Sequence, residues 1–308
     1  MRVAITGATG LIGSALARAL RARGDQVIAL TRDPNRARQV LGPDVEAHAW
    51  VRPKEADPPV DALAHADAVI HLLGEPLAQR WTEATKREIL DSRVLPTRRL
   101  AAALAALPAE QRPARLISQS AIGYYGPHGD EALDETAASG DDFLATVASS
   151  WEREAAAVRS ELRVVLTRTG VVLAPHGGAL AKMLPPFRLG VGGPVAGGRQ
   201  YVSWIHRDDV VGGLLVCVDD ERATGPVNLT APHPVTNAEL SRALGQVLRR
   251  PTVLPVPALA LRLLYGEMAA TVLTGQRVLP QRLLELGYEF EYGEVEPALR
   301  DALSAAPA

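Results

Sequence analysis

Residues 2–32, RVAITGATGLIGSALARALRARGDQVIALTR, decide the fold of this chain. An apolar β-type run leads into three glycines, Gly7, Gly10 and Gly13, at three-residue spacing, and an Ala- and Leu-rich helical pattern follows. A glycine turn between a strand and a helix lets the backbone approach a pyrophosphate closely, and the helix N-terminus adds free N–H groups. The stretch therefore predicts the phosphate-binding turn of a dinucleotide site. The alternative is a turn that only packs a strand against a helix.

The end of the second β-type run predicts which dinucleotide is bound. Thr31 and Arg32 stand where a carboxylate would accept hydrogen bonds from an adenosine ribose. A guanidinium at this place offers a planar charged fork that matches a phosphate, so the sequence favours NADP. Asp33 follows directly, which leaves NAD as the alternative cofactor and a plain surface arginine as the alternative role of Arg32.

The order of the elements predicts the fold class. Short runs rich in Val and Ile alternate with helical patterns, as in a parallel sheet that is covered on both faces. We therefore expect an α/β protein with a Rossmann-type doubly wound parallel sheet. The expected strands are 2–6, 26–30, 45–50, 66–74, 114–121 and 163–173, and helices are expected after Gly13 and over 83–107 and 143–159.

A change in composition predicts a second, smaller region. Residues 175–206 are rich in Gly and Pro, which indicates loops and insertions in place of further strand–helix units. We expect an NADP-binding Rossmann domain over 1–173 and a smaller C-terminal α/β substrate-binding region that takes up most of 174–308. Strands from 203–230 that return to the first sheet are left open.

Composition excludes several classes of protein. The chain has 308 residues, 47% of them hydrophobic and 22% charged, with a net charge of −2, so it is neither disordered nor basic enough to suggest nucleic-acid binding. The single Cys217 allows no intrachain disulfide. No apolar run of about 20 residues and no leader pattern is present, so we expect a cytoplasmic protein without a membrane partner.

These segments resemble the extended short-chain dehydrogenase/reductase family, of the sugar-nucleotide epimerase and dehydratase type, over nearly the whole chain. They also resemble an atypical subgroup with a C-terminal domain of unknown function, here at about 252–300, and with generally unassigned substrates. The stretches that carry the resemblance are TGATGLIG (6–13), HLLGEPL (71–77), DSRVLPTRRL (91–100), LISQSAIGYYG (116–126), SSWEREA (149–155), LTRTGVVLAP (166–175), SWIHRDDVVGGLL (203–215), PVNLTAPHPVT (226–236) and TGQRVLPQRLLELGYEF (274–290).

The resemblance implies a set of cofactor contacts. Arg93 stands in place of the asparagine in the family's usual N-V-x-G-T pattern. The expected cofactor-binding residues are Gly7, Thr9, Gly10, Leu11, Ile12, Gly13, Thr31, Arg32, Leu72, Leu73, Gly74, Arg93, Ser118 and Gly170.

The chain departs from the family at its catalytic pair. Active members use a Tyr-x-x-x-Lys pair, in which the tyrosine transfers a proton and the lysine lowers its pKa and holds the nicotinamide ribose. Counted from Ser120, the pair should fall within 140–154, which contains neither tyrosine nor lysine. Leu144 and Ala148 stand roughly at the expected places.

Other polar residues nearby are candidates for the chemistry. Ser118 and Ser120 share one face of a strand. Ser120 could hydrogen-bond a substrate carbonyl, and Tyr124 or Tyr125 could donate a proton. A purely structural role for these side chains is the alternative. Further candidates are the carboxylates Glu152 and Glu154, and the Gly-rich stretch offers Lys182, Arg199, Tyr201 and Trp204 as substrate contacts.

A metal site is not expected. His206 lies close in sequence to Asp208 and Asp209, but alternation along a strand would divide them between its two faces.

Two function hypotheses follow. The first is an NADP-dependent oxidoreductase or nucleoside-diphosphate-sugar-epimerase-like enzyme of unassigned substrate, which uses a proton donor other than the usual tyrosine. The alternative is a non-catalytic NADP(H)-binding redox sensor or scaffold. By analogy with related enzymes that pair two sheet-flanking helices, the chain is expected to be a monomer or a homodimer.

Overall fold

A seven-stranded parallel sheet forms the centre of the molecule, which the computed structural model describes over residues 1–174 and 176–304. The predicted Rossmann-type doubly wound sheet is confirmed. Its spatial order is β11-β7-β5-β4-β1-β2-β3. The strands are β1 (Arg2–Thr6), β2 (Gln26–Thr31), β3 (Glu46–Ala49), β4 (Ala68–His71), β5 (Arg115–Ala121), β7 (Arg163–Thr169) and β11 (Gly225–Leu229).

The strand order determines where a ligand can bind. From β1 the chain adds strands to one side, β2 and β3, and then crosses back to place β4, β5 and β7 on the other side. In such sheets ligands bind at the carboxyl ends of the strands, at the point where the order reverses. That point lies between β1 and β4, whose paired ends, Thr6 and His71, are followed by Gly7 and Leu72.

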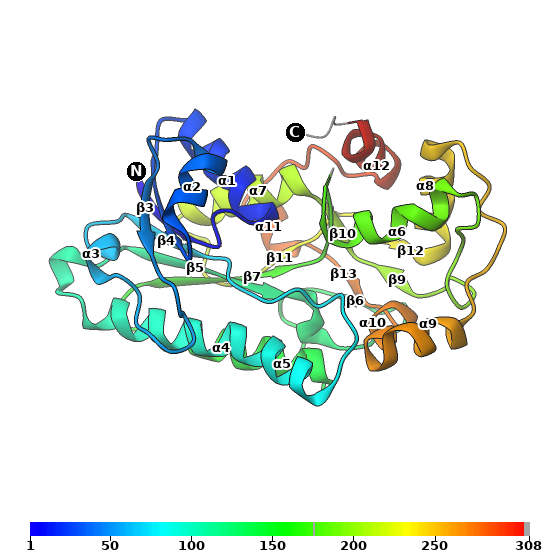
Figure 1. The fold of residues 1–308 in the computed structure, drawn as a ribbon, viewed down its shortest axis with the longest axis horizontal. Coiled ribbons are helices and arrows are strands. Elements are labelled where there is room, and N and C mark those ends of the chain that lie inside the picture. The colour runs from blue at the N-terminus through cyan, green and yellow to red at the C-terminus, as the bar shows by residue number, and fades with distance from the viewer. Residues whose placement is uncertain (175, 305–308) are drawn as a thin grey trace.

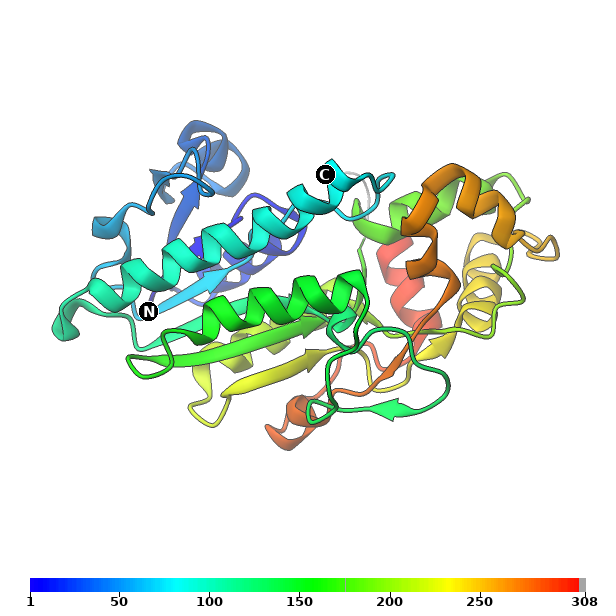
Figure 2. The ribbon, with the colours of Figure 1, turned by 90° about the horizontal axis from the view of Figure 1, so that it is seen from below.

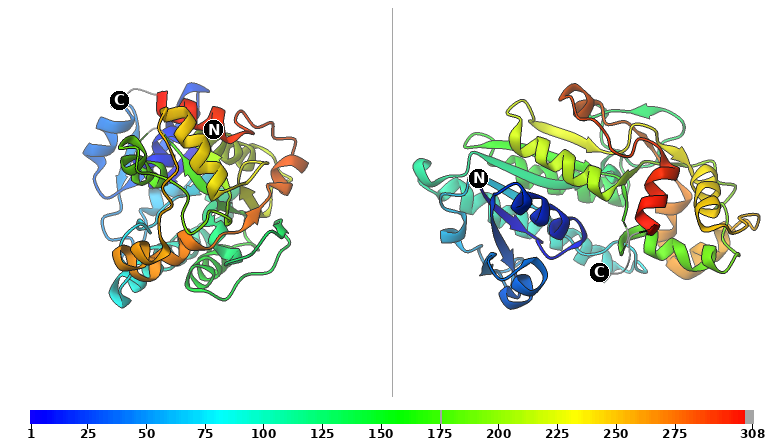
Figure 3. Two further views of the ribbon diagram at one scale, coloured as in Figure 1. Left: turned by 90° about the vertical axis from the view of Figure 1, so that its right-hand side faces the viewer. Right: turned by 90° about the horizontal axis from the view of Figure 1, so that it is seen from above.

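Helices cover both faces of the sheet. One face packs against α1 (Leu11–Ala22), α2 (Pro34–Leu41), α7 (Arg207–Asp219) and α11 (Gln281–Glu285). The other packs against α3 (Val60–Leu63), α4 (Glu83–Ala106) and α5 (Phe143–Ala156). Figure 2 shows α4 and α5 side by side across the sheet, and the right-hand view of Figure 3 shows α1 and α7 on the opposite face.

The remaining elements gather beyond the carboxyl ends of the strands (Figures 1 and 2). Their buried side chains form a separate apolar cluster around Trp204, Leu244 and Leu299. The helices are α6 (Gly178–Arg188), α8 (Asn237–Leu248), α9 (Ala258–Tyr265), α10 (Ala270–Leu273) and α12 (Val295–Ser304), with short 3₁₀ turns at Ile122–Tyr125 and Gly266–Ala269. A further 3₁₀ turn, Ala109–Gln111, lies at the amino end of the sheet, just before β5. The strand pairs are β6 (Ala132–Leu133) with β13 (Arg277–Val278), β8 (Val171–Leu173) with β10 (Trp204–His206), and β9 (Tyr201–Val202) with β12 (Val235–Thr236).

The stretch 175–206, expected to be loops, contains a helix. Within α6, Leu180, Leu184 and Phe187 are buried at spacings of four and three residues, which places them on one helical face. The prediction missed this face because Pro185 and Pro186 lie inside the helix. Pro175 and residues 305–308, part of the expected C-terminal region, lie outside the described residues. No helix in the described ranges is both long and apolar enough to cross a membrane.

Candidate functional site

The glycine turn joins β1 to α1 in a conformation that requires glycine. Gly7 has φ +68°, a value that side chains disfavour. The amide of Gly10 donates to the Gly7 carbonyl at 3.0 Å and closes the turn. A Cβ on Gly13 would lie 2.3 Å from the same carbonyl oxygen, so any side chain at position 13 would push α1 away from β1. Gly7 and Gly10 therefore form one tight turn, and Gly13 permits the close contact between helix and strand.

The start of α1 fits an anionic group. Gly10 is its N-cap and provides no side-chain hydrogen bond, and the first amide to donate inside the helix is that of Ser14, to the Gly10 carbonyl at 2.9 Å. The amides of Leu11, Ile12 and Gly13 therefore precede the helix's own ladder. A Cβ on Gly10 would meet only the Gly7 oxygen, at 3.2 Å, so the outer side of the turn is open. These donors and the helix dipole favour negative charge.

The end of β2 separates the roles of Arg32 and Asp33. Asp33 caps α2: its Oδ1 accepts from the amides of Asn35 and Arg36 at 3.0 and 3.1 Å. Its own amide donates to Thr31 Oγ1 at 3.2 Å. Arg32 is exposed, and its guanidinium has no partner in residues 1–174 or 176–304. The cation is thus available to a ligand, while Oδ1 of the neighbouring carboxylate holds a helix.

The end of β4 borders the glycine turn. The Leu72 amide donates to Thr6 Oγ1 at 3.1 Å, and a Cβ on Gly7 would lie 3.0 Å from the Leu72 carbonyl oxygen. Leu73 and Gly74 continue from there, and Gly74 is exposed. The predicted contacts from β1 and β4 are therefore neighbours in space.

A buried hydrogen-bond chain connects this edge to α4. His71 Nδ1 lies 2.8 Å from Thr6 Oγ1, and its Nε2 lies 2.9 Å from Thr97 Oγ1. Thr97 donates to the Arg93 carbonyl at 2.6 Å, so its oxygen accepts from Nε2–H, and Nδ1 accepts from Thr6. Burial lowers the pKa of His71 to about 3, which keeps the imidazole neutral. No motif or spacing in the sequence singled out this histidine.

A buried ion pair lies behind the ends of β5 and β7. Arg168 holds Glu152 with two hydrogen bonds, Nε to Oε1 at 2.8 Å and Nη2 to Oε2 at 2.9 Å. Ser120 donates to the same Oε1 at 2.7 Å. Glu154 instead points outward and pairs with the exposed Arg98 at 2.8 Å. Of the two carboxylates on α5, Glu152 is the one that belongs to the interior of the candidate site.

The two tyrosines of the 3₁₀ turn after β5 have different surroundings. Tyr125 is fully buried; it donates to Asn228 Oδ1 at 2.7 Å and accepts from Arg168 Nη1 at 3.0 Å. Burial raises the pKa of its hydroxyl to about 12. Tyr124 is half-buried, its ring lies 3.5 Å from the Arg168 guanidinium carbon, and its hydroxyl has no hydrogen-bond partner in the described part of the chain. Tyr124 is therefore the tyrosine whose hydroxyl is free to bind a ligand.

Apolar contacts replace the usual catalytic pair on α5. Leu144 packs against Gly123, where a Cβ would lie 3.1 Å from the leucine Cβ. Ala148 is buried, with 3% of its surface exposed. Neither position carries a group that could transfer a proton.

The other predicted residues take separate places. Ser118 is fully buried in β5, and Gly170 allows β7 to continue into β8, since its Cβ would lie 2.3 Å from the Ser203 oxygen. Lys182 donates to the Ala78 carbonyl at 2.8 Å. Trp204 is fully buried and donates to the His233 carbonyl, so it packs in the core and does not face a substrate. Arg199 is exposed, and Tyr201 stacks with Arg277.

The structure places His206, Asp208 and Asp301 together, with one ligand-type atom of each within 4.8 Å of the others. Hydrogen bonding explains much of this cluster. His206 Nδ1 accepts from the Asp208 amide at 3.3 Å and caps α7. Its Nε2 lies at an ion-pair distance of 3.2 Å from Asp301 Oδ2 but makes no hydrogen bond in the described residues. Asp209 accepts from Tyr288 and from two amides of 291–292. The segment thus fastens α12 and 288–292 to the sheet.

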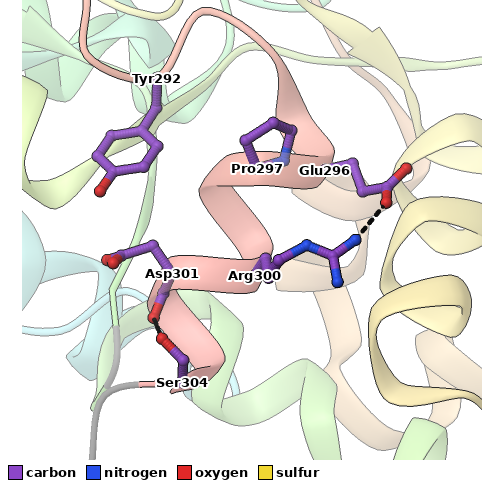
Figure 4. A pocket seen from close by; sticks show the side chains of 6 residues that line it. All are labelled: Tyr292, Glu296, Pro297, Arg300, Asp301 and Ser304. Atoms are coloured by element: carbon purple, nitrogen blue, oxygen red, sulfur yellow. Dashed lines mark hydrogen bonds and ion pairs between the residues drawn. The ribbon is translucent and has the colours of Figure 1, made fainter.

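An open hollow of about 660 Å³ lies on α12 (Figure 4). Two of its polar groups are already engaged nearby: Arg300 pairs with Glu296 at 2.6 Å, and Ser304 donates to the Asp301 carbonyl at 3.0 Å. Its lining residues are Tyr292, Glu296, Pro297, Arg300, Asp301 and Ser304. None of the predicted site residues lines this hollow.

The chain is similar to known proteins along nearly its whole length. A family model described as the NAD dependent epimerase/dehydratase family matches residues 3–229, and one described as a domain of unknown function (DUF1731) matches residues 256–302. An epimerase family protein of Arabidopsis thaliana, the chloroplastic SDR39U1 homolog, is 42% identical over 300 residues, which are 97% of this chain and 86% of that protein. An epimerase family protein of Mycobacterium bovis is 43% identical over 96% of both chains. The crystal structure of human epimerase family protein SDR39U1 with NADPH superposes with a TM-score of 0.88 and 34% identity, over 99% of this chain and 100% of that one.

We expect the Glu152–Arg168 pair to be essential for stability. Glu152→Ala leaves the Arg168 guanidinium buried without its counter-charge, which costs about 3–5 kcal/mol. Glu154→Ala on the same helix removes a pair with an exposed arginine and should cost less than about 1 kcal/mol. Urea unfolding of the two variants measures the difference. Equal losses would contradict the assignment of a buried structural pair.

His71 should make stability depend on pH. Its pKa is lower in the folded chain, about 3, than the ordinary 6.5, so the unfolded chain binds the proton first. The contribution of neutral His71 to the free energy of unfolding is fully present above about pH 6.5. It falls by about 1.4 kcal/mol per pH unit as the pH drops towards 3. His71→Gln keeps hydrogen-bonding groups but does not titrate, so its stability should fall less steeply between pH 6.5 and 4. The free energy of unfolding is measured with urea at each pH. The same pH dependence in both proteins across that range would contradict this role of His71.

Proposed function

The chain belongs to the NAD dependent epimerase/dehydratase family, and from that premise we propose that it is an NADP(H)-dependent enzyme of the oxidoreductase or nucleoside-diphosphate-sugar-epimerase-like type with an unassigned substrate. The observation that carries the proposal is the pairing of an anion-accepting helix start at Gly10–Gly13 with an unpartnered cation, Arg32, at the end of the next strand. A pyrophosphate at the first and a 2′-phosphate at the second are the two anionic groups of NADP.

Three observations favour NADP over NAD. Arg32 offers a planar fork with no competing carboxylate in the described residues. Asp33 Oδ1, which a ribose would otherwise use, already accepts two amides of α2. The human relative with a TM-score of 0.88 was crystallised with NADPH. Thr9, Leu11 and Ile12 of the turn, Leu72–Gly74 beside it, and Thr31, Ser118 and Gly170 are proposed to complete the cofactor site.

A side chain other than the family's usual tyrosine is available to transfer the proton. When bound, the nicotinamide supplies or accepts a hydride. We assign the proton transfer to Tyr124, because its hydroxyl is uncommitted and its ring lies against Arg168. Ser120 and Tyr125, also predicted as catalytic, have their hydroxyls bonded to Glu152 and Asn228, so we propose that they position Arg168 and the turn.

A redox sensor or scaffold is the second candidate. The apolar Leu144 and Ala148 in place of the usual catalytic pair favour it. The buried Glu152–Arg168 network that supports Tyr124 favours an enzyme, because a scaffold has no need of an oriented proton donor. Hydride transfer from NADPH to any small carbonyl compound, reduced in Tyr124→Phe, would distinguish the enzyme from the sensor.

The finer organisation remains a proposal. We propose a nucleotide-binding part over 1–173, joined at the sheet edge by β11, and a C-terminal part over 174–308 that supplies the substrate side of the site. Cytoplasmic location and a monomeric or homodimeric state are predictions from the sequence.

Arg32→Ala tests the cofactor assignment directly. Loss of the charge-assisted contacts to a phosphate should weaken NADPH binding by about 10- to 100-fold and leave NADH binding nearly unchanged. Isothermal titration calorimetry with NADPH, NADP, NADH and NAD measures both effects. Arg159→Ala is the matched control, because Arg159 is also exposed and lies far along the chain from the turn. Equal affinities of the wild-type protein for all four nucleotides would contradict the role of Arg32, and no binding of any would overturn the proposed function.

A further inference from the structure

Arg93 is a half-buried cation that forms no ion pair within the described residues. It extends from α4, where its Nη1 donates to the Ile89 carbonyl at 3.0 Å and its Nη2 to the Glu75 carbonyl at 2.9 Å. No carboxylate in residues 1–174 or 176–304 forms an ion pair with it, and burial lowers its pKa to about 10. Desolvating a charge is costly unless an opposite charge compensates. The described residues supply two backbone carbonyls and the face of the Trp151 ring, and the Glu75 carboxylate acts on the guanidinium without forming an ion pair with it.

The hydrogen-bonding capacity of this guanidinium is only partly used. A guanidinium has five N–H donors and no acceptor. The bonds to Ile89, Glu75 and, at 3.5 Å, Ser92 Oγ leave Nε–H and one N–H of Nη2 without a partner among the described residues. Two neighbouring donors in one plane match the two oxygens of a carboxylate or phosphate.

Trp151 adds a second donor without an acceptor. Its side chain is almost fully buried, with 4% of its surface exposed, and its indole Nε1–H has no partner in the part of the chain that the structure describes. The Arg93 guanidinium carbon lies 5.3 Å from the centre of its ring. Indole N–H groups only donate, and buried polar groups in proteins are normally paired. Both groups can only donate, so an anion is the kind of ligand that matches them.

The position of this pair connects it to the site. A Cβ on Gly74 would lie 3.1 Å from the guanidinium carbon of Arg93, so the guanidinium rests on the backbone at the end of β4. Leu72, two residues earlier, touches the glycine turn. On its other side the Arg93 guanidinium faces the ring of Trp151 on α5, the residue that precedes Glu152. The two donors thus border the loop after β4 and the helix that carries Glu152.

Arg163 shows what a purely structural arginine does in this chain. Burial also lowers the pKa of Arg163, and its Nη1 and Nη2 donate to the carbonyls of Cys217, Ala223 and Val218 around the end of α7. It begins β7, at the amino end of the sheet, far from the carboxyl edge where ligands bind. Arg163 is therefore a matched comparison for Arg93.

We propose that Arg93 and Trp151 bind an anionic group of the substrate, a carboxylate or a phosphate, so that the unassigned substrate is an anionic carbonyl or hydroxyl compound. The assignment of this anion to a substrate rests on the proposed NADP(H)-dependent function. The same chemistry could come from the cofactor's own phosphates, and the experiment separates these two sources.

The test is calorimetric titration of oxalate, and separately of inorganic phosphate, into the full-length protein saturated with NADPH. Saturation blocks the nucleotide's own phosphate sites, so the remaining anion binding belongs to the substrate side. We expect Arg93→Gln to weaken anion binding by about tenfold or more, and Trp151→Phe by about threefold or more. Arg163→Gln should leave anion binding unchanged. Arg93 is one of the cofactor contacts that the resemblance implies, and we assign it here to the substrate instead, so NADPH affinity should be the same in all four proteins.

Two results would overturn the proposal. One is anion binding that is equal in wild-type and Arg93→Gln protein. The other is weaker NADPH binding in Arg93→Gln together with no anion binding to the NADPH complex, which would assign the two donors to the cofactor. Arg93→Lys keeps the charge but loses the planar fork, and it serves if the glutamine variant does not fold. If no protein binds NADPH, the proposed function fails, and the same titrations of the free protein still decide whether Arg93 and Trp151 bind an anion.

Discussion

Helix α1 begins in contact with the carbonyl that follows strand β1, and only glycine at position 13 permits that contact. The close approach directs the unclaimed amides of α1 towards the carboxyl edge of the sheet. It also places Gly7 against Leu72, so that β4 and the loop after it border the same space. The contact between α1 and β1 therefore determines where the start of α1 and the loop after β4 lie, and the proposed cofactor site is built on both.

Buried polar groups extend the site from the turn into the helical layer. Thr6, His71 and Thr97 join β1 and β4 to α4 through neutral hydrogen bonds. Glu152 and Arg168 join α5 to β7 through an ion pair that also supports both tyrosines. Inside a protein such networks rigidify their surroundings when every member is satisfied. Among the donors that have no acceptor in the described residues, those on Arg93 and Trp151 lie beside these elements, and we propose that a ligand binds there.

Local patterns predicted what depends on neighbouring residues in the sequence. The alternation of Val-rich runs and helices indicated the parallel sheet, and the glycine spacing indicated the turn at Gly7–Gly13. The helix expected over 83–107 is observed as α4, in spite of Pro96. Interactions between distant segments were not predictable. Periodicity does not show that Glu152 meets Arg168, and the clustered prolines of α6 concealed its apolar face.

A crystal structure of the protein grown with NADPH tests the central claim, that the glycine turn and Arg32 form an NADP site. We expect the pyrophosphate to accept hydrogen bonds from the amides that begin α1, and the 2′-phosphate to contact the Arg32 guanidinium. We also expect the nicotinamide to lie on the side of Tyr124 and Arg93. A nucleotide bound elsewhere, or a 2′-phosphate that points away from Arg32 into solvent, would contradict the claim.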